Sequence, residues 1–214
     1  MPYWQGFQPG PPPAPPWADS LPAQLPDGRL LALPIRDYGA VGVGGFIANQ
    51  AAFPVVHQLA AWLVAALRPF APEVVVALPT LGQVFGPLVA EGLGHANWVA
   101  PGYTRKTWYE DALSVEMASS TGPLPRRLWL DPRLAGRLAG RRVALVDDVI
   151  STGTSALAGL ALLARLGVRP VALGVAMAQG NRWQGGWPAE VPVAAAFTSP
   201  LLRRVPGGWA PAAG

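Results

Sequence analysis

Residues 143–155 decide the fold, and they read VALVDDVISTGTS. Val143 to Val146 are apolar, and a short apolar run bounded by polar residues predicts a buried strand. Asp147 and Asp148 follow at the carboxyl end of this strand, and a turn rich in Ser, Thr and Gly then opens a helix. Backbone amides at such a turn and at a helix N-terminus form an anion site. The segment therefore predicts a strand, a turn and a helix, with an anion held at the turn.

The polar side chains of this segment indicate which anion it binds. Gly153 allows a tight turn, because glycine adopts a positive φ without strain. The hydroxyl donors around it are Ser151, Thr152, Thr154 and Ser155. Such a cup fits a phosphate monoester, and Asp147 and Asp148 can accept hydrogen bonds from two ribose hydroxyls. The segment predicts a ribose 5-phosphate site; the alternative is a plain strand–turn–helix in which one aspartate caps the helix.

Strands and helices alternate along the rest of the chain. Helices are expected at residues 50–68, 83–93 and 154–166, and strands at residues 30–35, 74–78, 98–100, 127–130, 143–146, 171–177 and 191–197. This alternation predicts an α/β fold with a doubly wound, mostly parallel sheet. In such sheets ligands bind at the carboxyl ends of the strands, which directs attention to the loops there.

Both ends of the chain and one internal segment lack this pattern. Residues 1–26 carry nine Pro and no periodic apolar face, which predicts a disordered, Pro-rich arm. Residues 201–214 are rich in Gly and Pro and are expected to be a flexible tail. Residues 101–126 show no clean period and are expected to form a mobile loop. The domain itself is expected to span residues 27–200.

Composition excludes several classes of protein. The chain of 214 residues has no Cys, which excludes disulfides, thiolate zinc sites, iron–sulfur clusters and a Cys nucleophile. Its 15 Arg and one Lys outnumber 12 acidic residues, giving a net charge of +4 that allows an anionic substrate. There is no G-K-[ST] phosphate loop, no targeting segment and no membrane-spanning stretch. We therefore expect a cytoplasmic protein that binds neither nucleic acid nor membranes.

The 13 residues quoted above resemble the motif with which type I phosphoribosyltransferases bind 5-phosphoribosyl 1-diphosphate (PRPP). The likeness extends over residues 70–178. It implies that Asp147 and Asp148 hold the ribose hydroxyls and that residues 151–155 hold the 5-phosphate. It also places a pyrophosphate loop at Thr80, Leu81 and Gly82, where backbone amides would bind the diphosphate; the alternative is a tight turn from strand to helix. Relatives often carry Arg or Lys at the position of Leu81, so one charge is missing here.

Arg105 and Lys106 resemble an Arg-Lys pair of the adenine and orotate enzymes in this family. The resemblance makes residues 103–125 a catalytic loop that closes over the substrate. Two cations beside the departing pyrophosphate would stabilise its growing negative charge. The alternative for the pair is a solvated position on the surface. The pair completes the set of residues to which the resemblance gives catalytic roles: Arg105, Lys106, Asp147 and Asp148.

The base pocket departs from the hypoxanthine type of enzyme. Ser151 stands where that type has an Asp, and no Lys follows the next strand, in the segment of residues 178–182. Adenine enzymes also lack that Asp and build part of the pocket from an N-terminal hood. Residues 27–50 could form such a hood, with Phe46, Ile47 and Asn49 as candidates, although the base-binding residues remain unassigned.

The resemblance implies transfer of a phosphoribosyl group from PRPP to a purine, adenine-like base, with release of pyrophosphate in nucleotide salvage. Mg²⁺ would be held by PRPP and water, without direct protein ligands. The alternative is a non-catalytic, PRPP-binding regulatory protein of the same fold, which the uncharged Leu81 favours. A homodimer is left open by the sequence.

Overall fold

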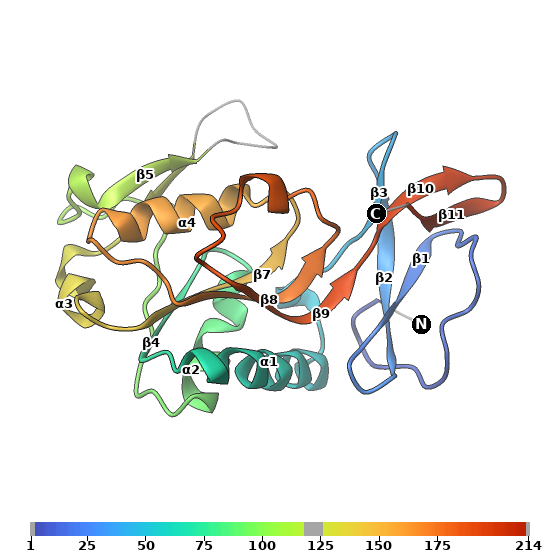
Figure 1. Cartoon of the computed structure of the whole chain (residues 1–214), viewed down its shortest axis with the longest axis horizontal. Coiled ribbons are helices and arrows are strands. Elements are labelled where there is room, and N and C mark those ends of the chain that lie inside the picture. Colours follow the sequence, from blue (N-terminus) through green and yellow to red (C-terminus); the bar gives the residue numbers. More distant parts are fainter. Residues whose placement is uncertain (1–2, 118–125, 213–214) are drawn as a thin grey trace.

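The structure is a computed structural model that describes residues 3–117 and 126–212. It consists of a parallel sheet covered by helices and a second, antiparallel sheet beside it (Figure 1). The helices are α1 (Phe53–Leu67), α2 (Gly86–Gly92), α3 (Ala135–Leu138) and α4 (Thr154–Ala164). Single 3-10 turns are η1 (Ala48–Gln50), η2 (Arg68–Phe70), η3 (Gly82–Val84), η4 (Asp111–Leu113), η5 (Pro132–Leu134) and η6 (Gln184–Gly186). Within the described ranges, no helix is long and apolar enough to cross a membrane.

The central sheet confirms the predicted α/β class. Its strands lie in the order β4, β7, β8, β9 and are parallel throughout. They are β4 (Val74–Ala77), β7 (Val143–Ile150), β8 (Ala172–Gln179) and β9 (Val193–Ser199). The strand expected at residues 98–100 is reduced to one bridge, in which Val99 pairs with Val76 beyond β4. The carboxyl ends of β4, β7 and β8 therefore lie next to one another, as a shared ligand site requires.

Helices cover both faces of this sheet (Figure 1). On one face, α1 and α2 pack against the sheet, and Pro54 and Pro87 lie in their first turns, where no amide hydrogen bond is lost. On the other face lies α4. Residues of β7 divide between the two cores: Ala144 and Val146 belong to one, and Val143 and Leu145 to the other. The buried β7 therefore fixes the position of the acidic pair that follows it.

The second sheet, called the hood below, combines strands from both ends of the chain. Its order is β1, β2, β3, β10, β11. The strands are β1 (Ser20–Gln24), β2 (Leu30–Asp37), β3 (Gly42–Gly44), β10 (Leu201–Val205) and β11 (Gly208–Pro211). The expected flexible tail at residues 201–214 is thus wrong for residues 201–211. Leu202 and Trp209 are buried, and Trp209 lies so close to Gly42 that a Cβ there would come within 2.6 Å of its ring.

The predicted disorder of residues 1–26 is likewise wrong for the residues that the structure describes. Residues 3–19, called the strap below, lie on the hood and on α1. The Trp4 indole donates to the Gly45 carbonyl at 2.9 Å, and the Ala52 amide donates to the Trp4 carbonyl at 3.0 Å. Trp17 exchanges two backbone hydrogen bonds with Trp209. The prolines fix an extended backbone, and the aromatic residues between them supply the contacts that a tail would lack.

Trp4→Ala is expected to lower the free energy of unfolding by about 2 kcal/mol, because it removes a partly buried indole that packs on the core. Urea unfolding monitored by circular dichroism measures this loss. Phe53→Ala is the matched control, since that ring is 79% exposed and its removal changes stability by less than about 0.5 kcal/mol. An equally small loss of stability for the two substitutions would show that Trp4 does not anchor the strap to the core.

The expected mobile loop lies partly outside the described residues, which omit 118–125. Its described flanks form a two-stranded antiparallel ribbon of β5 (Ser114–Met117) and β6 (Arg126–Trp129). The ribbon packs on α4, and Gly102 bridges to Trp129 at its base. The strand expected at residues 127–130 thus corresponds to β6, and the segment of residues 101–113 connects the edge of the sheet to the ribbon.

Candidate functional site

The acidic pair lies inside β7, which continues four residues beyond the expected end. Asp147 and Val149 pair with Val175 and Met177 of β8, so the ladder includes the pair. Asp147 is only 5% exposed, and its Oδ1 accepts a hydrogen bond from the Asp148 amide at 2.9 Å. Because both aspartates precede the first residue of α4 by six residues or more, neither caps that helix. The alternative of a capping aspartate is therefore wrong.

Burial governs the ionisation of this pair. It raises the pKa of the Asp147 carboxyl well above its ordinary value, and the neighbouring charge of Asp148 raises it further. Burial also raises the pKa of the Asp148 carboxyl. Charged carboxylates in such a place require hydrogen-bond donors or a cation. A ligand that brings hydroxyl groups would supply such donors to the pair.

The loop after β4 lies directly against the pair. The Leu78 amide donates to the Val146 carbonyl at 2.8 Å, and Thr80, Leu81 and Gly82 follow. A Cβ placed at Gly82 would lie 2.7 Å from Oδ1 of Asp147 and 2.8 Å from its Cα. Only glycine allows this close approach. The proposed pyrophosphate loop and the proposed ribose site are thus adjacent, and the peptide bond between Pro79 and Thr80 is cis.

The turn between β7 and α4 forms an open cavity of about 200 Å³, lined by residues 149–156. Gly153 has φ of +85°, the positive value that the sequence predicts for the turn. No side chain caps α4 at this residue, so the first amides of the helix can bind an anion. The hydroxyls of Thr152 and Thr154 lie 3.1 Å apart on the same side of the turn. The predicted phosphate cup, Ser151 to Ser155, is therefore brought together with the acidic pair.

Two residues at this site escaped the sequence analysis. The Tyr103 hydroxyl donates to the Pro79 carbonyl at 2.9 Å, and its pKa is raised by burial first and then by the charge of Asp147. The Arg182 guanidinium donates from Nη2 to the Ser151 hydroxyl at 2.9 Å. Its place beyond the carboxyl end of β8, the strand beside β7, was the signal that could have identified it.

Arg105 and Lys106 follow Tyr103 and lie on the surface. The Arg105 guanidinium lies 3.4 Å from an Asp111 carboxylate oxygen and 5.2 Å from the centre of the Trp129 ring. Lys106 is exposed. Because Tyr103 contacts Pro79, the segment that carries both cations starts beside the proposed pyrophosphate loop. Their part in catalysis remains a prediction.

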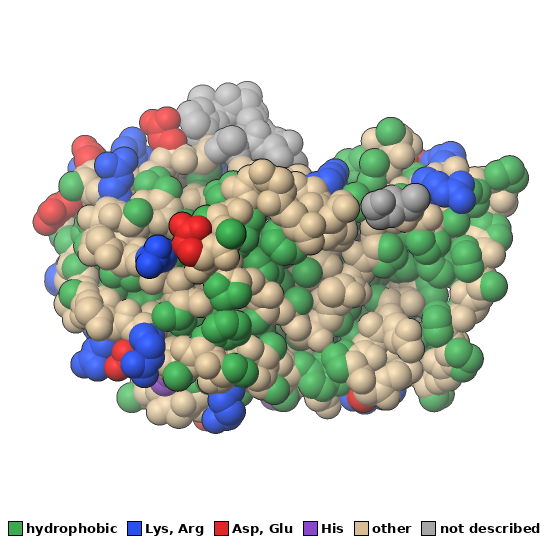
Figure 2. Space-filling model, viewed as in Figure 1, with side chains coloured by type: hydrophobic (Ala, Val, Ile, Leu, Met, Phe, Trp, Pro, Cys, Tyr) green, Lys and Arg blue, Asp and Glu red, His purple; other side chains and the backbone are tan. Residues whose placement is uncertain are grey.

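The hood is tied to the carboxyl end of β8. The buried Gln179 amide donates to the Gly44 carbonyl at 2.8 Å. Of the three candidates for the base pocket, Phe46 is buried in the core against Phe85, Ile47 is half-buried and Asn49 is exposed. In the space-filling view, hydrophobic side chains are frequent on the surface of the hood, at the right of the molecule (Figure 2).

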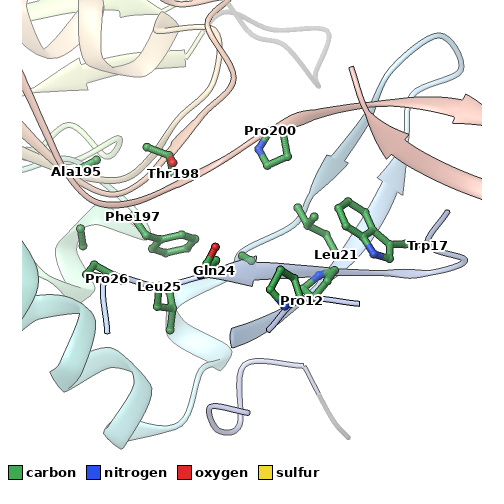
Figure 3. Close-up of a pocket in the computed structure, with 13 residues that line it drawn as sticks. Pro12, Trp17, Leu21, Gln24, Leu25, Pro26, Ala195, Phe197, Thr198 and Pro200 are labelled. Carbon is green, nitrogen blue, oxygen red and sulfur yellow. The ribbon is translucent and has the colours of Figure 1, made fainter. Parts of the chain in front are cut away.

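A separate groove of about 550 Å³ lies between β1, the strap and the outer strand β9 (Figure 3). Its lining includes Trp17, Leu21, Phe197 and Pro200 and contains no ionisable side chain. A polyanion has no charged partner there. The cup at the end of β7 is therefore the better candidate for binding a phosphorylated sugar.

The chain is similar in sequence to known proteins. Residues 45–185 match the family model of the phosphoribosyl transferase domain. Over 77 residues the chain is 39% identical to a hypoxanthine/guanine phosphoribosyltransferase of Methanosphaerula palustris, a match that covers 36% of this chain and 40% of that relative.

Solved structures share the fold. The adenine phosphoribosyltransferase of Rhodothermus marinus superposes with a TM-score of 0.54 at 21% identity, over 74% of this chain and 94% of the other. The adenine phosphoribosyltransferase of Saccharomyces cerevisiae gives a TM-score of 0.54 at 19% identity, over the same shares of the two chains.

Proposed function

Because this chain belongs to the phosphoribosyltransferase family, we propose that it transfers the 5-phosphoribosyl group of PRPP to a purine base and releases pyrophosphate. One observation carries the proposal: the phosphate cup and the buried acidic pair lie on one strand-end, with the loop of Thr80 to Gly82 against them. These three parts correspond to the 5-phosphate, the ribose hydroxyls and the diphosphate of a single ligand.

Each group of residues at the site binds a different part of PRPP. Asp147 and Asp148 accept hydrogen bonds from the ribose hydroxyls, while the amides and hydroxyls of residues 151–155 hold the 5-phosphate. The amides of Thr80 to Gly82 hold the diphosphate. The anomeric carbon loses its bond to pyrophosphate and gains a bond to a ring nitrogen of the base, which gives up a proton. Arg105 and Lys106 would stabilise the charge that builds on the leaving oxygen.

A magnesium ion fits the residues present. The described residues contain no cluster of three or more metal-ligating side chains, but the acidic pair offers carboxylate oxygens whose burial calls for a cation. Mg²⁺ usually keeps several of its water molecules and binds substrate phosphates, so PRPP and water would hold the ion beside the pair. When bound with PRPP, the ion neutralises charge on the diphosphate.

The base is proposed to be a purine of the adenine type. Ser151 occupies the position of the Asp of hypoxanthine enzymes, and its hydroxyl faces Arg182 within the phosphate cup. The solved neighbours named above are adenine enzymes, whereas the curated relative is by name a hypoxanthine/guanine enzyme. An assay of pyrophosphate release with adenine, hypoxanthine and guanine tests the choice, and a preference for hypoxanthine or guanine would contradict it.

The second candidate is a regulatory protein that binds PRPP without turning it over. Leu81 supplies no charge to the diphosphate, and Arg105 is paired with Asp111, which favour this candidate. The two functions differ in one measurement. Pyrophosphate release with any base supports the enzyme, whereas tight PRPP binding without release with any base supports the regulator.

PRPP with Mg²⁺ is expected to raise the melting temperature by about 5–11 °C at 100 times its Kd, because binding then adds about 2.7 kcal/mol to stability. ATP at equal concentration should have a much smaller effect, since the site offers partners for a ribose 5-phosphate and lacks a nucleotide-triphosphate loop. Differential scanning fluorimetry measures both shifts. Equal shifts with the two ligands, or none with PRPP, would refute the assignment of the site.

A further inference from the structure

Arg182 is a cation fixed beside the phosphate cup. It lies on the loop after β8, and β8 is paired in register with β7, with Ala178 opposite Ile150. The loop therefore leaves the sheet next to the turn that begins at Ser151. From there the Arg182 guanidinium donates a 2.9 Å hydrogen bond from Nη2 to the Ser151 hydroxyl. The contact joins two neighbouring strand-ends at the mouth of the cup.

The loop that carries Arg182 is anchored on both sides. The Gly180 amide donates to the Ser199 carbonyl at 2.8 Å, and the Trp183 indole donates to the Gly180 carbonyl at 3.1 Å. The Trp183 Cβ would lie 3.5 Å from a Cβ placed at Gly153, so the loop packs directly over the phosphate turn. Trp187 meets the Trp183 ring edge to face, with ring centroids 6.4 Å apart. Trp183 thus holds the loop against the cup on one side of Arg182, and the Gly180 amide holds it to β9 on the other side.

The charge of Arg182 is not used by another residue of the described chain. None of the ion pairs among residues 3–117 and 126–212 includes it. The cup itself, residues 151–155, offers only neutral amides and hydroxyls. A phosphate monoester carries a charge of about −1.5 to −2 at pH 7, and a guanidinium can bind it with two parallel hydrogen bonds. The cup lacks a charged partner for such a ligand, and Arg182 can provide it.

We propose that Arg182 binds the 5-phosphate of the ligand directly, with the Ser151 hydroxyl orienting its guanidinium. This inference rests on the proposed function, because it assigns a residue to the phosphate end of that site. The inference predicts a selective effect on binding. Arg182 strengthens the binding of ribose ligands that carry a 5-phosphate, and it contributes nothing to the binding of pyrophosphate at the other end of the site. Because the guanidinium is exposed, we expect its loss to weaken the binding of a ligand that carries a 5-phosphate only about tenfold.

Isothermal titration calorimetry with two probes tests the assignment. With ribose 5-phosphate, Arg182→Ala should raise the Kd about tenfold, and Arg182→Lys should raise it less because charge is kept while the planar fork is lost. With Mg-pyrophosphate, all variants should match the wild type. Arg169→Ala is the matched control: it removes the same charge from an exposed residue between α4 and β8, at the amino end of the sheet.

Each outcome has a distinct meaning. An unchanged Kd of Arg182→Ala for ribose 5-phosphate, beside a wild type that binds, overturns the role of Arg182 and leaves the proposed function standing. Equal weakening for ribose 5-phosphate and pyrophosphate also overturns it, because the residue would then support the whole site. A wild type that binds neither probe refutes the proposed function itself, and the inference with it.

Discussion

Asp147→Asn is expected to weaken PRPP binding by about 10- to 100-fold and to raise the melting temperature of the ligand-free protein. The weakening follows from the loss of a charge-assisted hydrogen bond to a ribose hydroxyl, worth roughly 1.5–3 kcal/mol. The gain in stability has a different cause. Burial raises the pKa of the Asp147 carboxyl, so its ionised form is less stable in the folded protein than in the unfolded chain.

The sign of this effect fixes its dependence on pH. The Asp147 carboxyl does not destabilise the folded protein at pH values below about 4, its pKa in the unfolded chain. As the pH rises from there toward the raised pKa of the folded state, the folded protein loses stability. Each unit of raised pKa corresponds to about 1.4 kcal/mol. Asn does not titrate, so the melting temperature of the variant should exceed that of the wild type by an amount that grows across this window.

Thermal unfolding at a series of pH values above 4 measures the difference. Asp131→Asn is a control of opposite sign, because a hydrogen bond from the Trp108 indole lowers the pKa of the Asp131 carboxyl. That variant should lose stability at neutral pH. If Asp147→Asn instead melts below the wild type at neutral pH, the carboxylate stabilises the fold, and its burial is structural.

Lys106→Ala is expected to lower kcat about 100-fold while leaving the Kd of PRPP nearly unchanged. The segment of Tyr103 to Lys106 starts beside the pyrophosphate loop, where the Tyr103 hydroxyl contacts the Pro79 carbonyl. A cation that reaches the diphosphate on closure acts mainly on charge that develops as the bond to the anomeric carbon breaks. Interactions stronger in the transition state than in the ground state appear in kcat. Removal of one such donor costs about 10²- to 10³-fold.

No other Lys can replace the lost side chain in this test, because Lys106 is the only Lys of the chain. Arg105 beside it can compensate in part, which places the expected loss at the lower end of the range. Steady-state kinetics and calorimetry on the same preparation separate kcat from PRPP affinity. Arg137→Ala, which removes an exposed cation from α3, should change neither. A Lys106→Ala enzyme with wild-type kcat would place the residue on the solvated surface.

The unit of β7, turn and α4 was predictable because its signals are local. Apolar residues, adjacent carboxylates and a Gly-containing turn follow one another within 13 residues, and together they predict a strand, a turn and a helix without reference to any distant residue. The length of β7 was not predictable. The pattern ends the strand at Val146, because carboxylates are rare inside strands, but pairing with β8 carries the ladder on to Ile150.

The strap and the hood strands were missed because their partners lie far away in the sequence. Composition alone suggests disorder for a segment with nine Pro, yet Trp17 pairs with Trp209 across the length of the chain. Arg182 was missed for the same reason: its contact with Ser151 depends on the register of β8 against β7. Local pattern therefore located the acidic pair and the cup, and long-range pairing supplied the residues around them.

The hood contains strands from both ends of the chain, and this affects its formation during synthesis on the ribosome. β1 and β2 emerge first, but β3 obtains its second neighbour only when β10 appears, more than 150 residues later. At translation rates of about 5–20 residues per second, the early hairpin waits on the order of ten seconds or more with its sheet incomplete. The parallel sheet can form during that interval. The hood is thus the last part of the molecule to be completed.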